Sequence, residues 1–281
     1  MVKGLWIVLA AVCWAQAPAP KPLMENTGKP IRVPLTCGSD EIVELALTCP
    51  AEQPCPVFLE LSALEAVGDR LFAAGNLHTE SATVESVLLA SDDAGRTWHE
   101  PHARIRQAGL DQVRFADLEH GWVSGHIMAA FPRDPFFLLT RDGGKTWRSQ
   151  PVSTESRAGA IEWFQFESRT NGSLWIDLGH AAVDGNRWEA YETSTGGDVW
   201  SLREMTDKSP KLSRAAPPAG WRLRPDAASK SYRIERLVSG RWTLATSFLV
   251  RAGECKEQET PLPEPPSQPE APPAARPPAD H

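Results

Sequence analysis

An apolar stretch long enough to span a bilayer is missing from this sequence, because the run Leu5–Ala15 falls short of the roughly twenty residues that a membrane helix needs. An excess of basic residues is missing as well: 29 Lys and Arg stand against 36 Asp and Glu, the formal net charge is −7, and no cluster of Lys and Arg stands out along the chain. Phosphate backbones are bound by such clusters. The sequence therefore predicts a protein that neither spans a membrane nor binds nucleic acid.

Motifs that carry known chemistries are also lacking. There is no nucleophile elbow, no phosphate-binding loop and no HExxH helix. No two cysteines have the CxxC spacing of a zinc site. His99 and His102 are three residues apart, which suits a helix but not a strand, so we expect a solvated loop there and a turn at His120. Neither a metal nor a cofactor is predicted.

The N-terminus has the features of an export signal, namely Lys3, the apolar run and small residues at cleavage positions. We predict a signal peptide at residues 1–15, with lipidation at Cys13 as the alternative, and export to the periplasm or the cell exterior. Residues 16–36 lack periodicity and are predicted to form a linker. The final 21 residues hold nine prolines, which predicts a disordered tail over residues 256–281.

Four cysteines remain after removal of the signal peptide: Cys37, Cys49, Cys55 and Cys255. An even number in an exported chain indicates two disulfides, for which three connectivities exist. We favour Cys49–Cys55, which would close a short loop. We pair Cys37 with Cys255, which would join the start of the folded region to its end. The folded domain is then predicted over residues 37–255.

A repeat of about fifty residues occupies this domain, and repeats of this length indicate a propeller or a similar array. Its mark is the pattern Ser/Thr-x-Asp-x-Gly-x-Thr-Trp, which occurs twice in full and once in a degenerate form where Thr195 replaces the Asp. The residues of the three copies are Ser91, Asp93, Gly95, Thr97 and Trp98; Thr140, Asp142, Gly144, Thr146 and Trp147; and Thr193, Gly197 and Trp200.

Each repeat also contains short apolar stretches separated by Gly, Asn and Asp, which is typical of strands joined in hairpins. Four strands per repeat make a propeller blade. A fourth repeat without a box follows from Trp221, and the stretch EIVELALTC from Glu41 is predicted to be one further strand. We therefore predict an all-β fold, a β-propeller of four or five four-stranded blades with Asp-box turns, in which the early strand completes the last blade.

The two full boxes resemble those of the BNR/Asp-box proteins, which include sialidases, sortilin-type receptors and the photosystem II stability/assembly factor-like propellers. The phrase VRFADLEHGWVSG at Val113–Gly125 is especially similar to a blade of the last group. The resemblance implies that Asp93 and Asp142 accept hydrogen bonds from loop N–H groups and that Trp98 and Trp147 pack against the sheet. It implies a fold and not a function.

Sialidase activity is not predicted, because such enzymes use an arginine triad and a Tyr–Glu nucleophile pair. Tyr191 is followed here by Glu192, which cannot share its face of a strand. A two-carboxylate glycosidase is the enzymatic alternative. Its candidate acids, each of which is also explained as a surface or turn residue, are Asp117, Glu119, Glu162 and Glu167. The sequence thus predicts no catalytic residues.

The predicted function is that of a non-enzymatic protein-binding or assembly scaffold, with a carbohydrate-binding or glycoside-hydrolysing propeller as the alternative. Loops of a propeller carry specificity, and the longest stretch between strands is His126–Phe137. Its mixture of aromatic side chains and Arg is typical of binding hot spots. The predicted partner-binding residues are Met128, Phe131, Arg133 and Phe136, unless the phenylalanines belong to the core.

Overall fold

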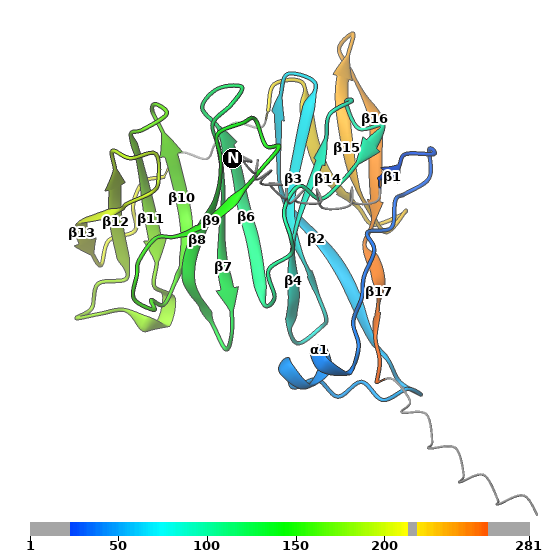
Figure 1. Cartoon of the computed structure of the whole chain (residues 1–281), viewed down its shortest axis with the longest axis horizontal. Coiled ribbons are helices and arrows are strands. Elements are labelled where there is room, and N and C mark those ends of the chain that lie inside the picture. The colour runs from blue at the N-terminus through cyan, green and yellow to red at the C-terminus, as the bar shows by residue number, and fades with distance from the viewer. Residues whose placement is uncertain (1–22, 213–217, 258–281) are drawn as a thin grey trace, which may run out of the picture.

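Regular structure in the computed structural model, which describes residues 23–212 and 218–257, is almost entirely β (Figure 1). Four antiparallel sheets, here called blades 1 to 4, contain most of the strands. In spatial order, blade 1 consists of β17 (Arg251–Cys255), β2 (Cys55–Val67), β3 (Arg70–His78) and β4 (Thr83–Ser91). Blade 2 consists of β6 (Ala108–Phe115), β7 (Gly121–Met128), β8 (Pro132–Thr140) and β9 (Arg148–Pro151).

Blade 3 consists of β10 (Ala160–Phe166), β11 (Gly172–Asp177), β12 (Trp188–Thr193) and β13 (Ser201–Thr206). Blade 4 has three strands, β14 (Trp221–Asp226), β15 (Ser231–Val238) and β16 (Arg241–Leu249). A small two-stranded ribbon pairs β1 (Met24–Glu25) with β5 (Thr97–Trp98). No helix of the described part of the chain is both long and apolar enough to cross a membrane.

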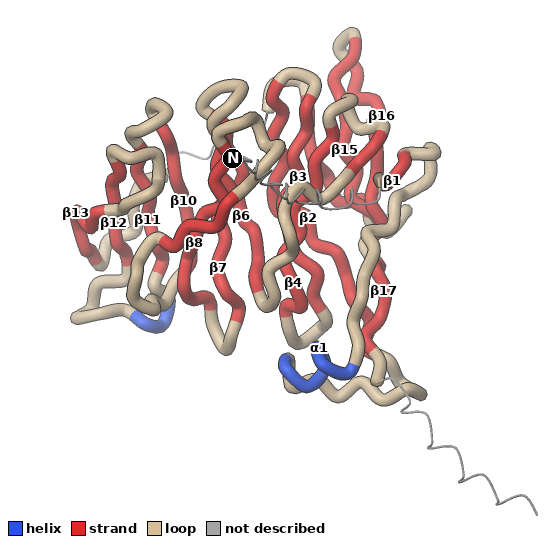
Figure 2. Tube along the Cα trace, viewed as in Figure 1, coloured by secondary structure: helices blue, strands red, loops and turns tan. Residues whose placement is uncertain are grey.

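The blades stand side by side in the order 3, 2, 1, 4 and form an arc whose two ends are blades 3 and 4 (Figures 1 and 2). Three buried hydrophobic clusters lie between neighbouring blades. They contain Trp98 and Phe248 between blades 1 and 4, Phe72 and Leu110 between blades 1 and 2, and Phe137 and Leu174 between blades 2 and 3. Within residues 23–212 and 218–257, no such cluster joins blade 3 to blade 4. The prediction of an all-β propeller of four or five blades is confirmed, with four blades among the described residues, of which blade 4 has three strands instead of four.

Position in the arc explains the burial pattern of the strands. In β3, the five residues from Leu71 to Gly75 are all buried. Leu71 belongs to the cluster shared with blade 4 and Phe72 to the cluster shared with blade 2, so both faces of this strand are covered. In β11, by contrast, buried and half-buried residues alternate, which is the period of a strand with one covered face.

Blade 1 combines the two ends of the folded region. β17 pairs with β2, where Cys255 lies opposite Cys55. The disulfides Cys37–Cys255 and Cys49–Cys55 are both present, in the pairing that the sequence predicts. The sequence predicts that an early strand completes the last blade. In the structure the C-terminal strand β17 completes blade 1 instead.

The stretch from Glu41 was predicted to be a strand and is helical instead, as α1 (Ser39–Glu44). Its first turn carries Asp40 and Glu41, which suit the positive end of a helix. The Glu41 carboxylate also accepts a hydrogen bond from the backbone N–H of Gly38 at 2.9 Å, as in a capping box. Of this helix only Ile42 is buried, so a short apolar pattern here could not distinguish helix from strand.

The predicted linker of residues 16–36 is wrong for its described part. Ile31 pairs with Phe248 at the edge of β16, and both Ile31 and Val33 are buried in the cluster between blades 1 and 4. The Asn26 side chain donates hydrogen bonds to the carbonyls of Gly95 and Ala245. The folded domain therefore begins near Met24. The predicted signal peptide, the first part of the linker and the tail from residue 258 lie outside the described residues.

Candidate functional site

The full Asp boxes share one hydrogen-bond arrangement. The Asp93 carboxylate accepts hydrogen bonds from the backbone N–H groups of Arg96 (3.0 Å) and Thr97 (2.9 Å), and from the hydroxyls of Thr97 and Ser91. Asp142 makes the corresponding bonds to the threonines of its own box. Burial alone would raise the pKa of both carboxyls, but these hydrogen bonds outweigh it and hold each pKa below its usual range.

The tryptophans of the boxes are fixed by the glycines. The indole N–H of Trp98 donates to the Gly95 carbonyl (3.3 Å), and that of Trp147 donates to the Gly144 carbonyl (3.0 Å). Gly95 and Gly144 have backbone φ angles of 91° and 85°, which residues with a side chain rarely adopt. The boxes thus anchor the turns that follow β4 and β8, and their residues serve the fold.

The degenerate third box makes fewer contacts. The Thr195 hydroxyl accepts a hydrogen bond from the backbone N–H of Val199 at 2.9 Å, and the N–H of Gly197 donates to the Thr193 hydroxyl at 3.2 Å. The Trp200 indole N–H has no partner among the described residues. Thr195 therefore replaces one of the backbone contacts that the Asp provides in the other copies.

Tyr191 does pair with a glutamate, but with Glu189 and not with its neighbour Glu192. Residues two apart share a strand face, and the Tyr191 hydroxyl donates to Glu189 at 2.9 Å. Arg157 holds the same carboxylate through its Nε at 2.7 Å. Burial and the bond to Glu189 raise the pKa of Tyr191 far above its ordinary value. This is the opposite of the activation that a nucleophilic phenol requires.

The four acids considered for a glycosidase are dispersed. Asp117 and Glu119 lie in the β6–β7 turn, whereas Glu162 and Glu167 lie at opposite ends of β10. Burial alone would raise the pKa of Asp117, but backbone N–H groups of the turn and the Arg169 guanidinium lower it well below its usual range. A carboxyl with so low a pKa is a poor general acid near neutral pH.

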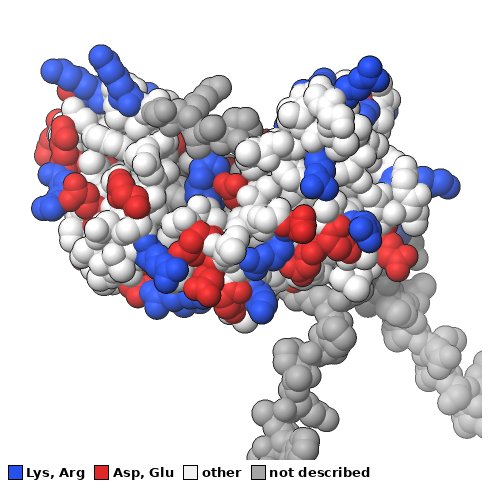
Figure 3. All heavy atoms as spheres, turned by 90° about the horizontal axis from the view of Figure 1, so that it is seen from above, with Lys and Arg blue, Asp and Glu red and all other residues white. Residues whose placement is uncertain are grey.

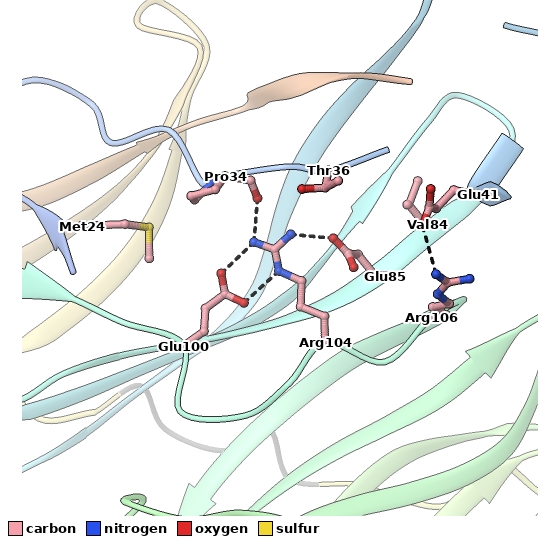
Figure 4. A pocket seen from close by; sticks show the side chains of 9 residues that line it. All are labelled: Met24, Pro34, Thr36, Glu41, Val84, Glu85, Glu100, Arg104 and Arg106. Carbon is pink, nitrogen blue, oxygen red and sulfur yellow. Dashed lines mark hydrogen bonds and ion pairs between the residues drawn. The ribbon is translucent and has the colours of Figure 1, made fainter. Parts of the chain in front are cut away.

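A charged cleft of about 420 Å³ lies between β4 and the N-terminal segment (Figure 4). At its centre Arg104 donates two hydrogen bonds to Glu100, at 2.8 and 2.7 Å, one to Glu85 at 2.5 Å and one to the Pro34 carbonyl at 2.7 Å. Burial alone would lower the pKa of Arg104, but the two glutamates raise it. Arg106 binds α1 in the same way. These charges satisfy one another and fasten the N-terminal segment to blade 1.

A pocket of different character, about 360 Å³ in volume and mostly apolar, lies beside the β7–β8 turn; we call it the Phe131 pocket. It is lined by Phe131 and Pro132, by residues 158–160 before β10, and by residues 177–181 at the end of β11, which include the short 3-10 helix Gly179–Ala181. The Phe131 side chain is 61% exposed. Glu162 also lines the pocket and is exposed to solvent.

The segments around this pocket are fixed to one another. The Asp134 N–H donates to the Arg157 carbonyl at 2.6 Å, and the Asp134 carboxylate accepts from the Arg157 N–H at 2.9 Å. The Gly159 N–H donates to the Pro132 carbonyl at 2.8 Å. A side chain at Gly159 would come within 2.6 Å of the Asp177 carbonyl oxygen, so the three lining segments are closely packed. The walls of the pocket are therefore held in place by backbone hydrogen bonds and close packing.

No protein-family model and no curated protein matches the chain. Among solved structures it is similar to YCF48 bound to D1 peptide, with 17% identity over 68% of this chain and 56% of that one, and a TM-score of 0.40. By its own sheets and box contacts, the fold is a β-propeller with Asp-box turns. A Penicillium chrysogenum α-L-arabinanase complexed with arabinobiose shares 12% identity over 79% of this propeller and 66% of its own chain, with a TM-score of 0.36.

The corresponding values for the GH93 α-L-arabinofuranosidase of Fusarium graminearum with arabinobiose are 15% identity, 79% of this chain, 65% of that chain and a TM-score of 0.35. The propeller thus spans 56% of the YCF48 chain and about two-thirds of the two arabinan-degrading enzymes. At these identities the likenesses bear on the fold alone.

Of the four predicted partner-binding residues, only Phe131 lines the Phe131 pocket. Phe136 is buried in the cluster between blades 1 and 2, so the prediction that it binds a partner is wrong. The stretch His126–Phe137 is not a long loop, because β7 and β8 take up all of it except residues 129–131. Met128 lines a separate cavity, and its sulfur lies 3.0 Å from Nε2 of His126. Arg133 is partly exposed and paired with Asp134 at 2.9 Å.

Sequence reasoning missed the other two segments of the Phe131 pocket. Residues 158–160 and 178–181 are mostly Ala and Gly, which carry no chemical signal of their own. The φ of 57° at Gly179 reflects the tight turn after β11. Among residues 23–212 and 218–257, no cluster of three or more His, Cys, Asp or Glu could hold a metal ion.

Proposed function

We propose that this propeller is an exported, non-enzymatic binding module that holds an apolar side chain of a protein partner in the Phe131 pocket. The observation that carries the proposal is the 61% exposure of the Phe131 ring at the edge of a mostly apolar pocket. A partner's side chain that enters the pocket can bury apolar surface against the pocket wall and against the exposed Phe131 ring at the same time. The two disulfides support export.

The charge at the pocket specifies the partner further. Glu162 is exposed there and forms no ion pair within 4.0 Å among the described residues, although its charge acts on Arg187, which holds Asp177 at 2.6 Å. A partner segment that places Lys or Arg next to its apolar side chain would therefore gain an ion pair with Glu162. We infer a preference for apolar residues with a basic neighbour.

Carbohydrate binding, the second candidate from the sequence, requires an exposed aromatic platform. Of the described tryptophans only Trp242 is exposed, and the Arg222 guanidinium lies 4.3 Å from its ring centre. The Phe131 pocket contains no Trp or Tyr. This arrangement favours a peptide over a sugar.

Selection of binders from a random peptide library on the purified protein tests the proposal. We expect peptides that combine an apolar residue with Lys or Arg, and at least about tenfold weaker binding to Phe131→Ala. Leu118→Ala is the matched control, because Leu118 is 63% exposed in a different turn, away from the pocket. Equal binding by Phe131→Ala, or an oligosaccharide array that yields ligands when the peptide library yields none, would contradict the proposal.

A further inference from the structure

Blades 3 and 4 each have one sheet face that no other blade covers. Blades 1 and 2 contribute residues to two hydrophobic clusters each, whereas each end blade contributes to only one. Seen from above, the two ends of the arc form lobes on either side of a hollow (Figure 3). Blades in a propeller are ordinarily covered on both faces. Within the described residues, the outer faces of the two end blades are therefore not covered by another sheet.

The outer face of blade 4 exposes a cluster of large apolar side chains. Strand register places Leu237, Trp242 and Leu244 on the face opposite Ile234, which packs against blade 1. Their exposed fractions are 43%, 39% and 46%. Arg222 shares this face, where its guanidinium stacks on Trp242. Exposed apolar groups gathered in one place on a sheet mark an interaction surface.

The two end blades carry opposite charge. Residues 221–249 of blade 4 include six basic and two acidic side chains. Residues 160–206 of blade 3 include eight acidic and three basic side chains. On the outer faces, register places Arg224 in blade 4 and Glu204 in blade 3. Both are exposed, and neither has an ion-pair partner in the described part of the chain.

We propose that the outer face of blade 4 binds the outer face of blade 3 of a second copy of this chain, and that the two copies do so reciprocally. A two-fold axis between the copies makes the two contacts identical and uses each outer face once, so the assembly closes. Three strands about 4.8 Å apart and about seven residues long give a face of roughly 330 Å². Four such faces come to roughly 1,300 Å², which lies within the range of stable interfaces.

Sedimentation equilibrium of the purified protein tests this proposal. We expect a dimer in the low micromolar range that weakens as salt is raised, because part of the attraction is between charges. Trp242→Ala combined with Leu237→Ala should weaken dimerisation at least tenfold. Phe131→Ala and Leu118→Ala should leave it unchanged, which separates this surface from the Phe131 pocket. Thermal unfolding of every variant checks that it is folded.

Charge reversal in two different copies tests the reciprocal geometry. Arg224→Glu alone and Glu204→Arg alone should each weaken their own dimer severalfold, because both contacts then bring like charges together. An equimolar mixture of the two variants should form the mixed dimer with near wild-type strength, since both of its contacts again pair opposite charges. A wild-type protein that stays monomeric at about 100 µM, or a mixture that associates no better than the single variants, would overturn the proposal.

Discussion

The Asp142 carboxylate accepts three hydrogen bonds in the second box, two from Thr146 and one from the Thr140 hydroxyl. Asp142→Ala leaves the Thr146 N–H without its acceptor in the turn after β8. Because this turn is partly exposed, water replaces some of the loss, and we expect the free energy of unfolding to fall by about 1–3 kcal/mol. Thr195→Ala in the third box removes a neutral hydroxyl that accepts from the Val199 N–H at 2.9 Å and makes longer contacts with the Val199 carbonyl (3.4 Å) and the Thr193 hydroxyl (3.2 Å). Because neutral hydrogen bonds are weaker than those to a carboxylate, this change should cost about 0.5–1.5 kcal/mol.

Urea titrations of the two variants measure both losses, with Thr195→Ser as the control that keeps the hydroxyl. Thr195→Asp should recover part of the difference, because a carboxylate at this position can accept from both the Val199 N–H and the Thr193 hydroxyl. If Thr195→Ala cost as much as Asp142→Ala, the third box would be as strongly held as the second. Equal losses would refute our expectation that a carboxylate, whose hydrogen bonds are charge-assisted, holds a box more strongly than a hydroxyl.

Three further predictions concern the disulfides, the carboxyls of the Asp boxes and catalysis. Replacing Cys37 and Cys255 with Ser should lower the free energy of unfolding by about 5 kcal/mol, and replacing Cys49 and Cys55 should lower it by about 2 kcal/mol. On the chain-entropy model the difference arises because the bridged residues are 218 positions apart in the first pair and 6 in the second. Equal losses in urea titrations would contradict this prediction. The pKa values of Asp93 and Asp142 in the folded protein lie below 3.8, so the free energy of unfolding should fall as the pH drops from about 4 through those folded values. The fall should be less steep in Asp142→Asn, which has one such carboxyl fewer. Parallel pH curves for the variant and the wild type would count against this prediction. A panel of chromogenic glycosides should give no turnover, and turnover abolished by changing Asp117, Glu119, Glu162 or Glu167 would make the protein an enzyme.

Features encoded by residues close together in the chain could be predicted from the sequence. The Asp box is one: its carboxylate, glycine and tryptophan lie within eight residues, and their contacts are the ones that the pattern implies. The Cys49–Cys55 disulfide closes a short loop in the same way. The Cys37–Cys255 disulfide was predictable because only four cysteines remain after the signal peptide, and once Cys49 and Cys55 close a short loop these two are left to pair.

Features that depend on pairing between distant segments could not be predicted from the sequence. The partner of β2 is β17, which no local signal in Arg251–Cys255 indicates. The apolar residues around Ile42 are compatible with a strand or a short helix, because only one of them, Ile42, is buried and the sequence does not show which. Phe131 and Phe136 looked alike in the sequence, yet one lies in a turn and the other in β8, whose inner residues are buried on both faces of blade 2.

The most direct test of the account is photo-crosslinking from the Phe131 pocket. Benzoylphenylalanine placed at position 131, and separately at position 118 as the control, is irradiated in the presence of a peptide selected on the wild-type protein. We predict a crosslink from position 131 to the apolar residue of the peptide, none from position 118, and competition by the unlabelled peptide. A peptide that crosslinks equally from both positions, or from neither while it still binds, would show that the Phe131 pocket is not the binding site.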